Sequence, residues 1–339
     1  MDLTMFEHIY LETTTICNLR CSMCPRFGGE DISSQPVIMP MEVFASLRPD
    51  LPKLKSMALV GCGEPTTDRR LLGFVTEATR AGVYTMFTTN GMFLDEEYDQ
   101  QIIQSGLMLL GVSLDGATPD TFESIRDGAS FMKVVLNLRR FMELRQQTGS
   151  RPLVKIQIVL MKRNLYELAA LVNLAADLKV EEVYAKNLCF LRTHELIAES
   201  LQEEYDPSVD VCQRDEFIAA ALEVARRRNL RLVLPSFRRS GSNDCPYHPG
   251  TTLFIRRNGD VFPCPIYAVW NYGVERNVIL EKRMGNVLEQ PLTEIWVSER
   301  YQIFRDRFLA GEERLCQGCT VWRQGYQAYS PQPIQSYIY

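Results

Sequence analysis

The sequence lacks the features that mark several classes of protein. No apolar run approaches the ~18 residues that a membrane-spanning helix needs, and no charged amino-terminal segment leads into an apolar stretch of the kind found in secretory signals. Lysine and arginine form no block other than Arg226-Arg227-Arg228, at the end of an expected helix, and the net charge is −5. These absences argue against membrane, secreted and nucleic-acid-binding proteins.

Histidine is also scarce, whereas cysteine is not. The chain has three histidines and ten cysteines in 339 residues. His8 and His248 are not spaced from other residues in the way that metal ligands usually are. In a chain of this size without a secretory signal, grouped cysteines bind metal more often than they form disulfides. We therefore expect a cytoplasmic protein, and a hydrophobic content of 46% is enough for a large globular core.

Strand-like and helix-like segments alternate over the first 235 residues. Expected strands cover residues 8–13, 57–60, 84–89, 109–115, 153–161, 183–188 and 230–234. Expected helices cover residues 40–47, 68–81, 95–105, 118–125, 131–147, 164–178 and 217–228. This alternation predicts a parallel sheet covered by helices. The pattern alone does not choose between an open doubly wound sheet and a barrel.

Three cysteines lie within eight residues directly after the first expected strand. Cys17, Cys21 and Cys24 have the spacing C-x3-C-x2-C, and the next cysteine is Cys62. Three thiolates this close together can bind one metal centre. Because most four-iron clusters take four cysteines, a cluster held by three would keep one iron open for another ligand. A structural zinc site or incidental thiols are the alternatives, although structural zinc usually has four protein ligands.

This spacing resembles the signature of the radical S-adenosylmethionine enzymes. The resemblance implies that Cys17, Cys21 and Cys24 hold a 4Fe–4S cluster whose open iron chelates S-adenosylmethionine. In that family, reductive cleavage of the cofactor gives a 5′-deoxyadenosyl radical, which abstracts a hydrogen atom from the substrate. The resemblance also implies a partial (β/α)6 TIM-type barrel, in which ligands lie at the carboxyl ends of the strands.

A glycine-rich motif follows the second expected strand. Gly61-Cys62-Gly63-Glu64-Pro65 resembles the Gly-Gly-Glu motif with which the family binds the methionine amine. The glycines, Gly63 among them, let the backbone approach a ligand, and Glu64 offers an acceptor to an ammonium. Cys62 stands where the family usually has glycine, and we interpret it as a buried small residue because buried cysteine behaves as a small hydrophobe.

The resemblance implies further cofactor contacts in four places. Ser113 ends the fourth strand, where the family contacts the ribose or carboxylate. Asn90 is either another such contact or a turn residue, since Asn-Gly favours a turn. Arg126 resembles an arginine of the subgroup with a carboxy-terminal cluster domain and can clamp a carboxylate; a solvated helix end is the alternative. Met23 occupies a position where many relatives place an aromatic residue against the adenine.

A second group of cysteines follows residue 235. It consists of Cys245, Cys264, Cys316 and Cys319, spaced C-x13-G-x4-C and then C-x2-C. Asn258-Gly259 between apolar stretches 251–256 and 261–262 predicts a β-hairpin, and residues 292–309 are expected to form one helix. The set resembles the twitch domain, a shortened SPASM domain, which implies a fully ligated auxiliary 4Fe–4S cluster. A zinc ribbon is the alternative.

We expect a radical S-adenosylmethionine barrel over residues 1–235, an auxiliary-cluster domain over residues 236–325 and a tail over residues 326–339. The resembled subgroup includes the aminocyclitol dehydrogenase of the butirosin pathway. It predicts oxidation of a small polar, sugar-like or cofactor-like substrate, with the auxiliary cluster accepting an electron and a ferredoxin or flavodoxin as donor. Alternatives are a maturase of a ribosomal peptide, protein or metal cofactor, a sugar-acid decarboxylase, and a non-catalytic iron–sulfur or zinc scaffold.

No motif identifies the acid–base residues. Tyr184, Lys186, Arg192 and His194 surround the sixth expected strand, at the mouth of the expected barrel, and are candidates. Structural or solvated roles are the alternative for each of them. Cys189 and Cys212 belong to no recognisable spacing.

Overall fold

Strands and helices alternate along the first two thirds of the chain. The structure, a computed structural model, describes residues 5–27, 37–149, 151–191, 193–238, 245–270, 282–313, 316, 319, 321 and 326–329. The strands of this part are β1 (His8–Leu11), β2 (Ser56–Leu59), β3 (Tyr84–Thr89), β4 (Leu109–Ser113), β5 (Leu153–Leu160), β6 (Glu182–Asn187) and β7 (Arg231–Pro235). The helices are α1 (Met41–Leu47), α2 (Leu71–Arg80), α3 (Glu96–Gln104), α4 (Pro119–Ile125), α5 (Phe131–Thr148), α6 (Lys162–Leu165), α7 (Leu168–Asp177), α8 (His194–Ala198) and α9 (Val211–Arg228).

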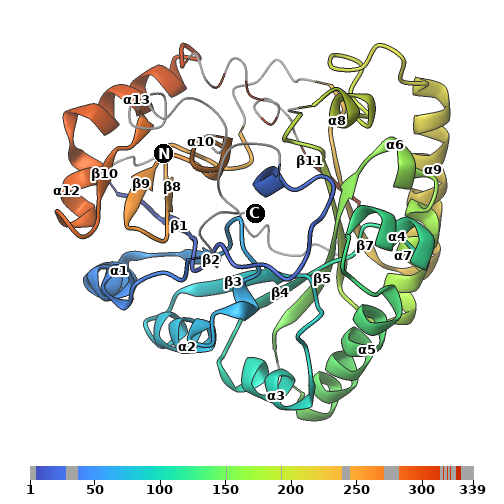
Figure 1. Cartoon of the computed structure of the whole chain (residues 1–339), viewed down its shortest axis with the longest axis horizontal. Helices are drawn as coiled ribbons and strands as arrows, with labels where there is room; N and C mark the ends of the chain where they lie inside the picture. Colours follow the sequence, from blue (N-terminus) through green and yellow to red (C-terminus); the bar gives the residue numbers. More distant parts are fainter. Residues whose placement is uncertain are drawn as a thin grey trace.

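The strands β1 to β7 form a curved parallel sheet with its helices on the outside. Each of them pairs in parallel with the next along the chain. Helices α1, α2, α3, α5, α7 and α9 lie around the outer face of the curve (Figure 1). The described strands do not close into a full barrel. The prediction of a partial barrel is therefore confirmed, and an open sheet with helices on both faces is excluded.

The two faces of the strands differ in composition. Along β5, Val154, Ile156 and Ile158 are buried in the apolar core that includes the helices. The residues between them, Lys155 and Gln157, point to the inner side and line a cavity there. This alternation follows from the two-residue period of a strand. It leaves a polar interior inside an apolar shell.

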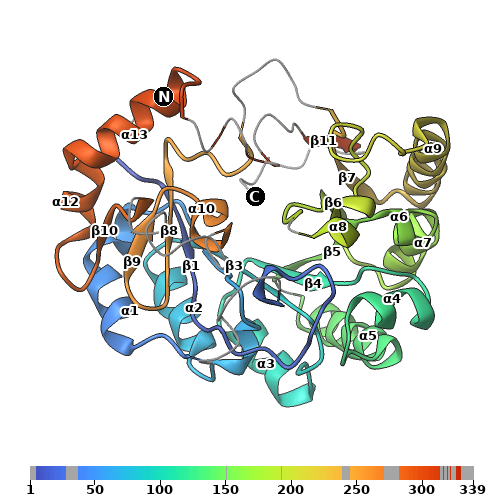
Figure 2. The ribbon, with the colours of Figure 1, turned by 45° about the horizontal axis from the view of Figure 1, so that its top comes forward.

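The carboxy-terminal part of the chain extends this sheet at both edges. It contains β8 (Thr252–Ile255), β9 (Asp260–Phe262), α10 (Pro265–Trp270), β10 (Gly285–Asn286), α12 (Leu292–Val297), α13 (Glu299–Leu309) and β11 (Tyr326–Tyr329). Strand β8 pairs in parallel with β1, whereas β11 pairs antiparallel with β7. Figure 2 shows β8, β9, α12 and α13 beside β1 and β11 on the opposite side. The expected hairpin is confirmed, since β8 and β9 are antiparallel and Gly259 between them has a φ of 87°.

Several helix boundaries differ from the sequence prediction. The single helix expected over residues 292–309 is two helices, because Ser298 is extended and its side chain caps α13 by accepting from the Tyr301 amide. The helix expected to begin at residue 217 begins at Val211, where the Asp210 side chain caps it. The short helix α8 was not predicted. No helix in the described ranges combines the length and the apolar character that crossing a bilayer requires.

Candidate functional site

The cysteine loop between β1 and α1 is packed onto the end of α4. The amides of Arg20 and Ser22 donate to the carbonyls of Asp127 and Ile125, both at 2.9 Å. The side chains of Cys21 and Met23 are buried and belong to a small apolar cluster with Ile125. The loop is therefore held in place by backbone hydrogen bonds and by its own apolar residues, which leaves the thiols facing a cavity.

Backbone amides are directed at the sulfur atoms of this loop. The Leu19 amide donates to the Cys17 sulfur at 3.4 Å, and the Arg26 amide bonds to the Cys24 sulfur. Burial raises the pKa of all three thiols, that of Cys21 to about 12. The guanidinium of Arg126 opposes this effect, because it favours the thiolate form. Such surroundings suit thiolates that bind a positively charged metal centre.

The glycine-rich loop after β2 lies against the loop after β1. A β-carbon on Gly63 would lie 2.3 Å from the Thr14 carbonyl oxygen, and one on Gly61 would lie 2.5 Å from the Glu12 side chain. The Glu64 amide also donates to the Ile16 carbonyl at 2.7 Å. Only glycine permits this close approach at positions 61 and 63.

The Glu64 carboxylate connects the loops after β2 and β3. Its Oε1 atom accepts from the Thr66 amide and hydroxyl and from the Thr89 hydroxyl, and Oε2 accepts from the Asn90 amide at 2.7 Å. Burial raises the pKa of this carboxyl group, although these hydrogen bonds favour its charged form. Oε1 accepts three hydrogen bonds and Oε2 only one, so the ammonium donor that the sequence predicts would have to approach Oε2.

Asn90 and Arg126 make specific contacts within the site. The Asn90 side chain accepts from the Met92 amide, as in a turn, and donates to the Asn18 side chain at 2.9 Å. The side chain of Arg126 is 11% exposed and pairs with Asp115 at 2.5 Å. The interpretation of Arg126 as a solvated helix end is therefore wrong, because the residue is buried and charge-paired beside the cysteine loop.

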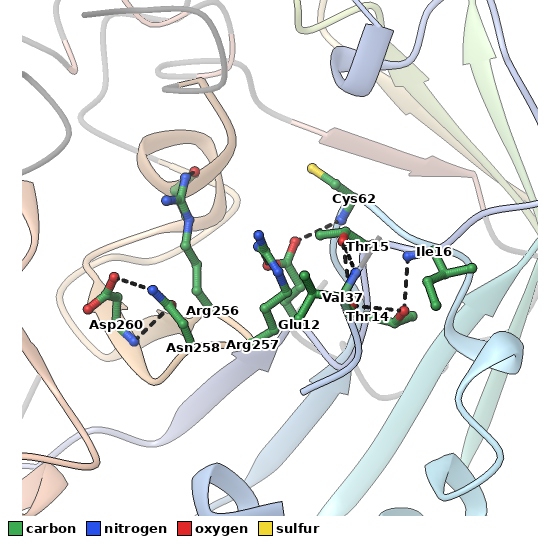
Figure 3. Close-up of polar contacts among 11 residues, drawn as sticks. Glu12, Thr14, Thr15, Ile16, Val37, Cys62, Arg256, Arg257, Asn258 and Asp260 are labelled. Carbon is green, nitrogen blue, oxygen red and sulfur yellow. Dashed lines mark hydrogen bonds and ion pairs between the residues drawn. The ribbon is translucent and has the colours of Figure 1, made fainter. Parts of the chain in front are cut away.

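An ion pair connects the amino-terminal loop to the carboxy-terminal hairpin. Glu12 Oε1 accepts from the Cys62 amide at 3.1 Å, and Glu12 Oε2 pairs with Arg257 at 3.1 Å (Figure 3). Glu12 is fully buried, and Arg257 lies at the turn between β8 and β9. Cys62 itself is buried, as expected for a small apolar residue.

The four later cysteines form a second group. Cys264 and Cys316 are buried, and charges on Cys245, Cys316 and Cys319 would raise the pKa of Cys264 further above its usual range. Backbone amides again point at sulfur: Tyr267 donates to Cys264 and Val321 to Cys319, both at 3.4 Å. In both groups the candidate metal ligands are cysteine sulfur atoms, some of them buried, and backbone amides donate to them.

One cavity of about 340 Å³ lies at the first cysteine group and extends toward the second. At one end it is lined by Cys17, Cys21 and Cys24, together with the six expected cofactor contacts Met23, Gly63, Glu64, Asn90, Ser113 and Arg126. Tyr247, Pro265 and Ile266, which neighbour Cys245 and Cys264 in sequence, also line it. A ligand in this cavity would therefore contact the first cysteine group and lie beside the second.

The candidate acid–base residues have different positions. Lys186 lines the cavity, and Tyr184 lies deeper, inside the sheet. His194 is exposed at the start of α8 and is absent from the described lining, and Arg192 lies outside the described residues. Sequence reasoning missed Cys189, which lines the cavity although its isolated position in the sequence gave no signal.

The donor set fits iron–sulfur clusters better than a single ion. No group of three or more Cys, His, Asp and Glu side chains in the described part of the chain is arranged to hold a metal ion. A four-iron cluster is larger than an ion and spaces its thiolates more widely. The buried thiols, with amides directed at their sulfur atoms, are consistent with that larger group.

Family comparisons match both cysteine groups. The model described as the radical SAM superfamily matches residues 11–175, and the model described as SPASM, an iron–sulfur cluster-binding domain, matches residues 245–320. The first range contains Cys17, Cys21 and Cys24. The second begins at Cys245 and ends one residue after Cys319.

Two curated relatives extend these matches. The tungsten-containing aldehyde ferredoxin oxidoreductase cofactor-modifying protein of Pyrococcus furiosus is 29% identical over 308 residues, which cover 88% of this chain and 83% of that protein. A probable GTP 3′,8-cyclase of Sulfurisphaera tokodaii is 29% identical over 180 residues, which cover 52% of this chain and 55% of that protein.

Solved structures share the fold. Streptococcus suis SuiB bound to S-adenosylmethionine aligns with a TM-score of 0.66 and 16% identity, over 94% of this chain and 71% of that chain. The protein anSMEcpe with bound AdoMet and Cp18Cys peptide aligns with a TM-score of 0.62 and 17% identity, over 92% of this chain and 86% of that chain.

Proposed function

Because the chain belongs to the radical S-adenosylmethionine superfamily and carries a SPASM-type iron–sulfur cluster-binding domain, we propose that it oxidises a small polar, cofactor-like substrate by hydrogen-atom abstraction. Enzymes of this family use a 4Fe–4S cluster and S-adenosylmethionine, and SPASM domains carry auxiliary clusters. When bound, the cluster and S-adenosylmethionine supply a 5′-deoxyadenosyl radical that removes a hydrogen atom from the substrate.

We assign the first cluster to Cys17, Cys21 and Cys24. Met23, Gly63, Glu64, Asn90, Ser113 and Arg126 then surround S-adenosylmethionine, since they line the same cavity. Glu64 Oε2 accepts from the methionine ammonium, and Arg126 keeps the charge beside the cluster balanced.

We assign the auxiliary cluster to Cys245, Cys264, Cys316 and Cys319. These four cysteines supply four thiolates, the usual number of ligands of a 4Fe–4S cluster. A substrate that has lost a hydrogen atom must lose one more electron and a proton to become a two-electron oxidised product. An auxiliary cluster held by these cysteines would accept that electron. The single observation that carries this proposal is the cavity, which is lined by the first cysteine group and by residues close in sequence to Cys245 and Cys264.

The substrate class rests on the relatives. The Pyrococcus relative is named for modifying the cofactor of a tungsten enzyme, which favours a cofactor-like substrate. We expect the electron donor to be a ferredoxin or flavodoxin of the cytoplasm.

The decisive experiment measures iron and 5′-deoxyadenosine in anaerobically reconstituted protein. The wild type should hold about eight irons, as two four-iron clusters, and release 5′-deoxyadenosine with dithionite and S-adenosylmethionine. Replacing Cys17, Cys21 and Cys24 by alanine should abolish release. Cys316→Ala with Cys319→Ala should keep release with about four irons but prevent product formation. Loss of release in both variants would contradict the electron-acceptor role.

A further inference from the structure

A second, smaller cavity lies inside the curved sheet. Its volume is about 60 Å³, several times the ~10–15 Å³ that one water needs. Polar residues from β1, β3, β5, β6 and β11 line it, together with one from the loop before β8: Tyr10, Thr88, Lys155, Gln157, Tyr184, Lys186, Tyr326 and Tyr247. Lys186 also lines the larger cavity, so the two cavities meet at this side chain.

Two lysines face one aromatic ring in this cavity. The Nζ atom of Lys155 lies 4.7 Å and that of Lys186 lies 5.5 Å from the ring centre of Tyr184. Lys155 is 3% exposed. Two ammonium groups in such a place repel each other and lose hydration, which is costly unless negative charge offsets it. Burial accordingly lowers the pKa of both lysines, that of Lys155 to about 7.

Among the described residues, one carboxylate lies next to these lysines. Glu182 is adjacent to Lys155 across β5 and β6, but it is also adjacent to Arg231 across β6 and β7 and pairs with that guanidinium at 3.0 Å. Two cations, Lys155 and Arg231, thus share this carboxylate. The described residues that line the small cavity include two lysines and no aspartate or glutamate.

Neutral hydrogen-bond donors complete the lining. Burial raises the pKa of Tyr10, Tyr184 and Tyr326, so their hydroxyl groups stay protonated and can donate. Tyr326 stacks on Tyr184 with ring centres 5.2 Å apart, which places the carboxy-terminal strand β11 against the cavity. The amide of Gln157 adds another donor.

We propose that the small cavity binds a compact anionic group of the substrate, a phosphate or a carboxylate, between Lys155 and Lys186. This inference rests on the proposed function, because it makes the cavity the anchor for the same substrate. The anion lies between the two ammonium groups, and the tyrosines and Gln157 donate to its oxygens. The rest of the substrate passes Lys186 into the larger cavity, where its reacting carbon would face the S-adenosylmethionine site beside the first cysteine group.

The test uses the reconstituted full-length holoenzyme and small anions as probes. Inorganic phosphate and acetate are titrated by calorimetry and by thermal unfolding, since a ligand of the native state raises the melting temperature. The variants are Lys155→Met and Lys186→Met. Lys133→Met on the exposed face of α5 is the matched control.

We expect one probe to bind the wild type and Lys133→Met alike, and to bind either cavity variant at least tenfold more weakly. Preference for phosphate over acetate, or the reverse, identifies which anion the substrate carries. Without probe, Lys186→Met should melt no lower than the wild type, because it removes a buried charge. If either methionine variant unfolds, Lys186→Arg keeps the charge and should keep binding.

Equal binding of a probe to all variants, or no binding of either probe to the wild type, would overturn the proposal. These results are independent of 5′-deoxyadenosine formation. A chain that binds phosphate only with intact lysines but never releases 5′-deoxyadenosine would refute the proposed enzyme activity and not the anion site.

Discussion

The guanidinium of Arg126 lies between a carboxylate and a cluster thiol: its Nη1 atom donates to the Cys21 sulfur at 3.8 Å, while Nε pairs with Asp115. Asp115 is fully buried and also accepts from the Val159 amide at 2.7 Å. This arrangement fixes a positive charge beside the first cysteine group.

Replacing Arg126 by methionine should lower the reduction potential of the first cluster. A positive charge stabilises the more negative, reduced form, so its loss makes reduction harder. A hydrogen bond worth about 1 kcal/mol corresponds to roughly 40 mV for one electron. Potentiometric titration followed by electron paramagnetic resonance measures this shift. Arg126→Lys keeps the charge and should move the potential less; an unchanged potential in the methionine variant would show that the contact is only structural.

Gly63→Ala should abolish S-adenosylmethionine cleavage. The added methyl group would meet the Thr14 carbonyl at 2.3 Å, so the loop after β2 must move away from the loop after β1. Gly73 in α2 is the matched control, because nothing lies within 4 Å of a β-carbon there. Gly73→Ala should keep activity and gain about 0.5–1 kcal/mol of stability. Release of 5′-deoxyadenosine and thermal unfolding measure both effects, and full activity of Gly63→Ala would refute the tight contact.

The sequence was sufficient to predict the residues around the first cysteine group. Cys17 and Glu64 follow strands, Ser113 is the last residue of β4, and Arg126 follows the helix α4. In a parallel sheet of this kind the carboxyl ends of the strands meet at one edge. Residues far apart in sequence therefore line one cavity, as the structure shows. Their roles toward the cofactor stay predictions.

The interior of the sheet could not be predicted in the same way. The alternation along β5 separates Lys155 and Gln157 from their apolar neighbours, but it does not say which face is the inside. The pairing of β8 with β1 and of β11 with β7 joins segments more than 90 residues apart. No local sequence pattern specifies such long-range contacts. The stacking of Tyr326 on Tyr184 could therefore be recognised only in the structure.

Arg257→Met should destabilise the protein by about 3 kcal/mol, because it leaves the buried Glu12 carboxylate without this guanidinium. The double variant Glu12→Gln with Arg257→Met should recover much of the loss, since glutamine can still accept from the Cys62 amide. Urea unfolding measures the difference. Arg48→Met breaks an exposed pair with Glu77 and should cost less than about 1 kcal/mol. Equal costs for both arginines would argue against the buried pair as a link between β1 and the hairpin.

His8 should make stability depend on pH between about 6.5 and 4. The imidazole is 4% exposed and accepts or donates one hydrogen bond with Ser56 at 2.8 Å, and burial lowers its pKa from 6.5 to about 4. The unfolded chain therefore binds this proton first as the pH falls. The stabilisation from neutral His8 is complete above pH 6.5 and is lost toward pH 4, by at most about 3 kcal/mol.

Urea unfolding of the wild type and of His8→Gln over this pH range tests the effect. The wild type should lose stability more steeply on acidification than the variant, because glutamine takes up no proton. Nuclear magnetic resonance can follow the same group directly, since the chain has three histidines and the variant identifies the His8 signal by its loss. A His8 signal that titrates near pH 6.5 would mean that the ring is solvated in the native state, and the steeper loss of stability should then be absent as well.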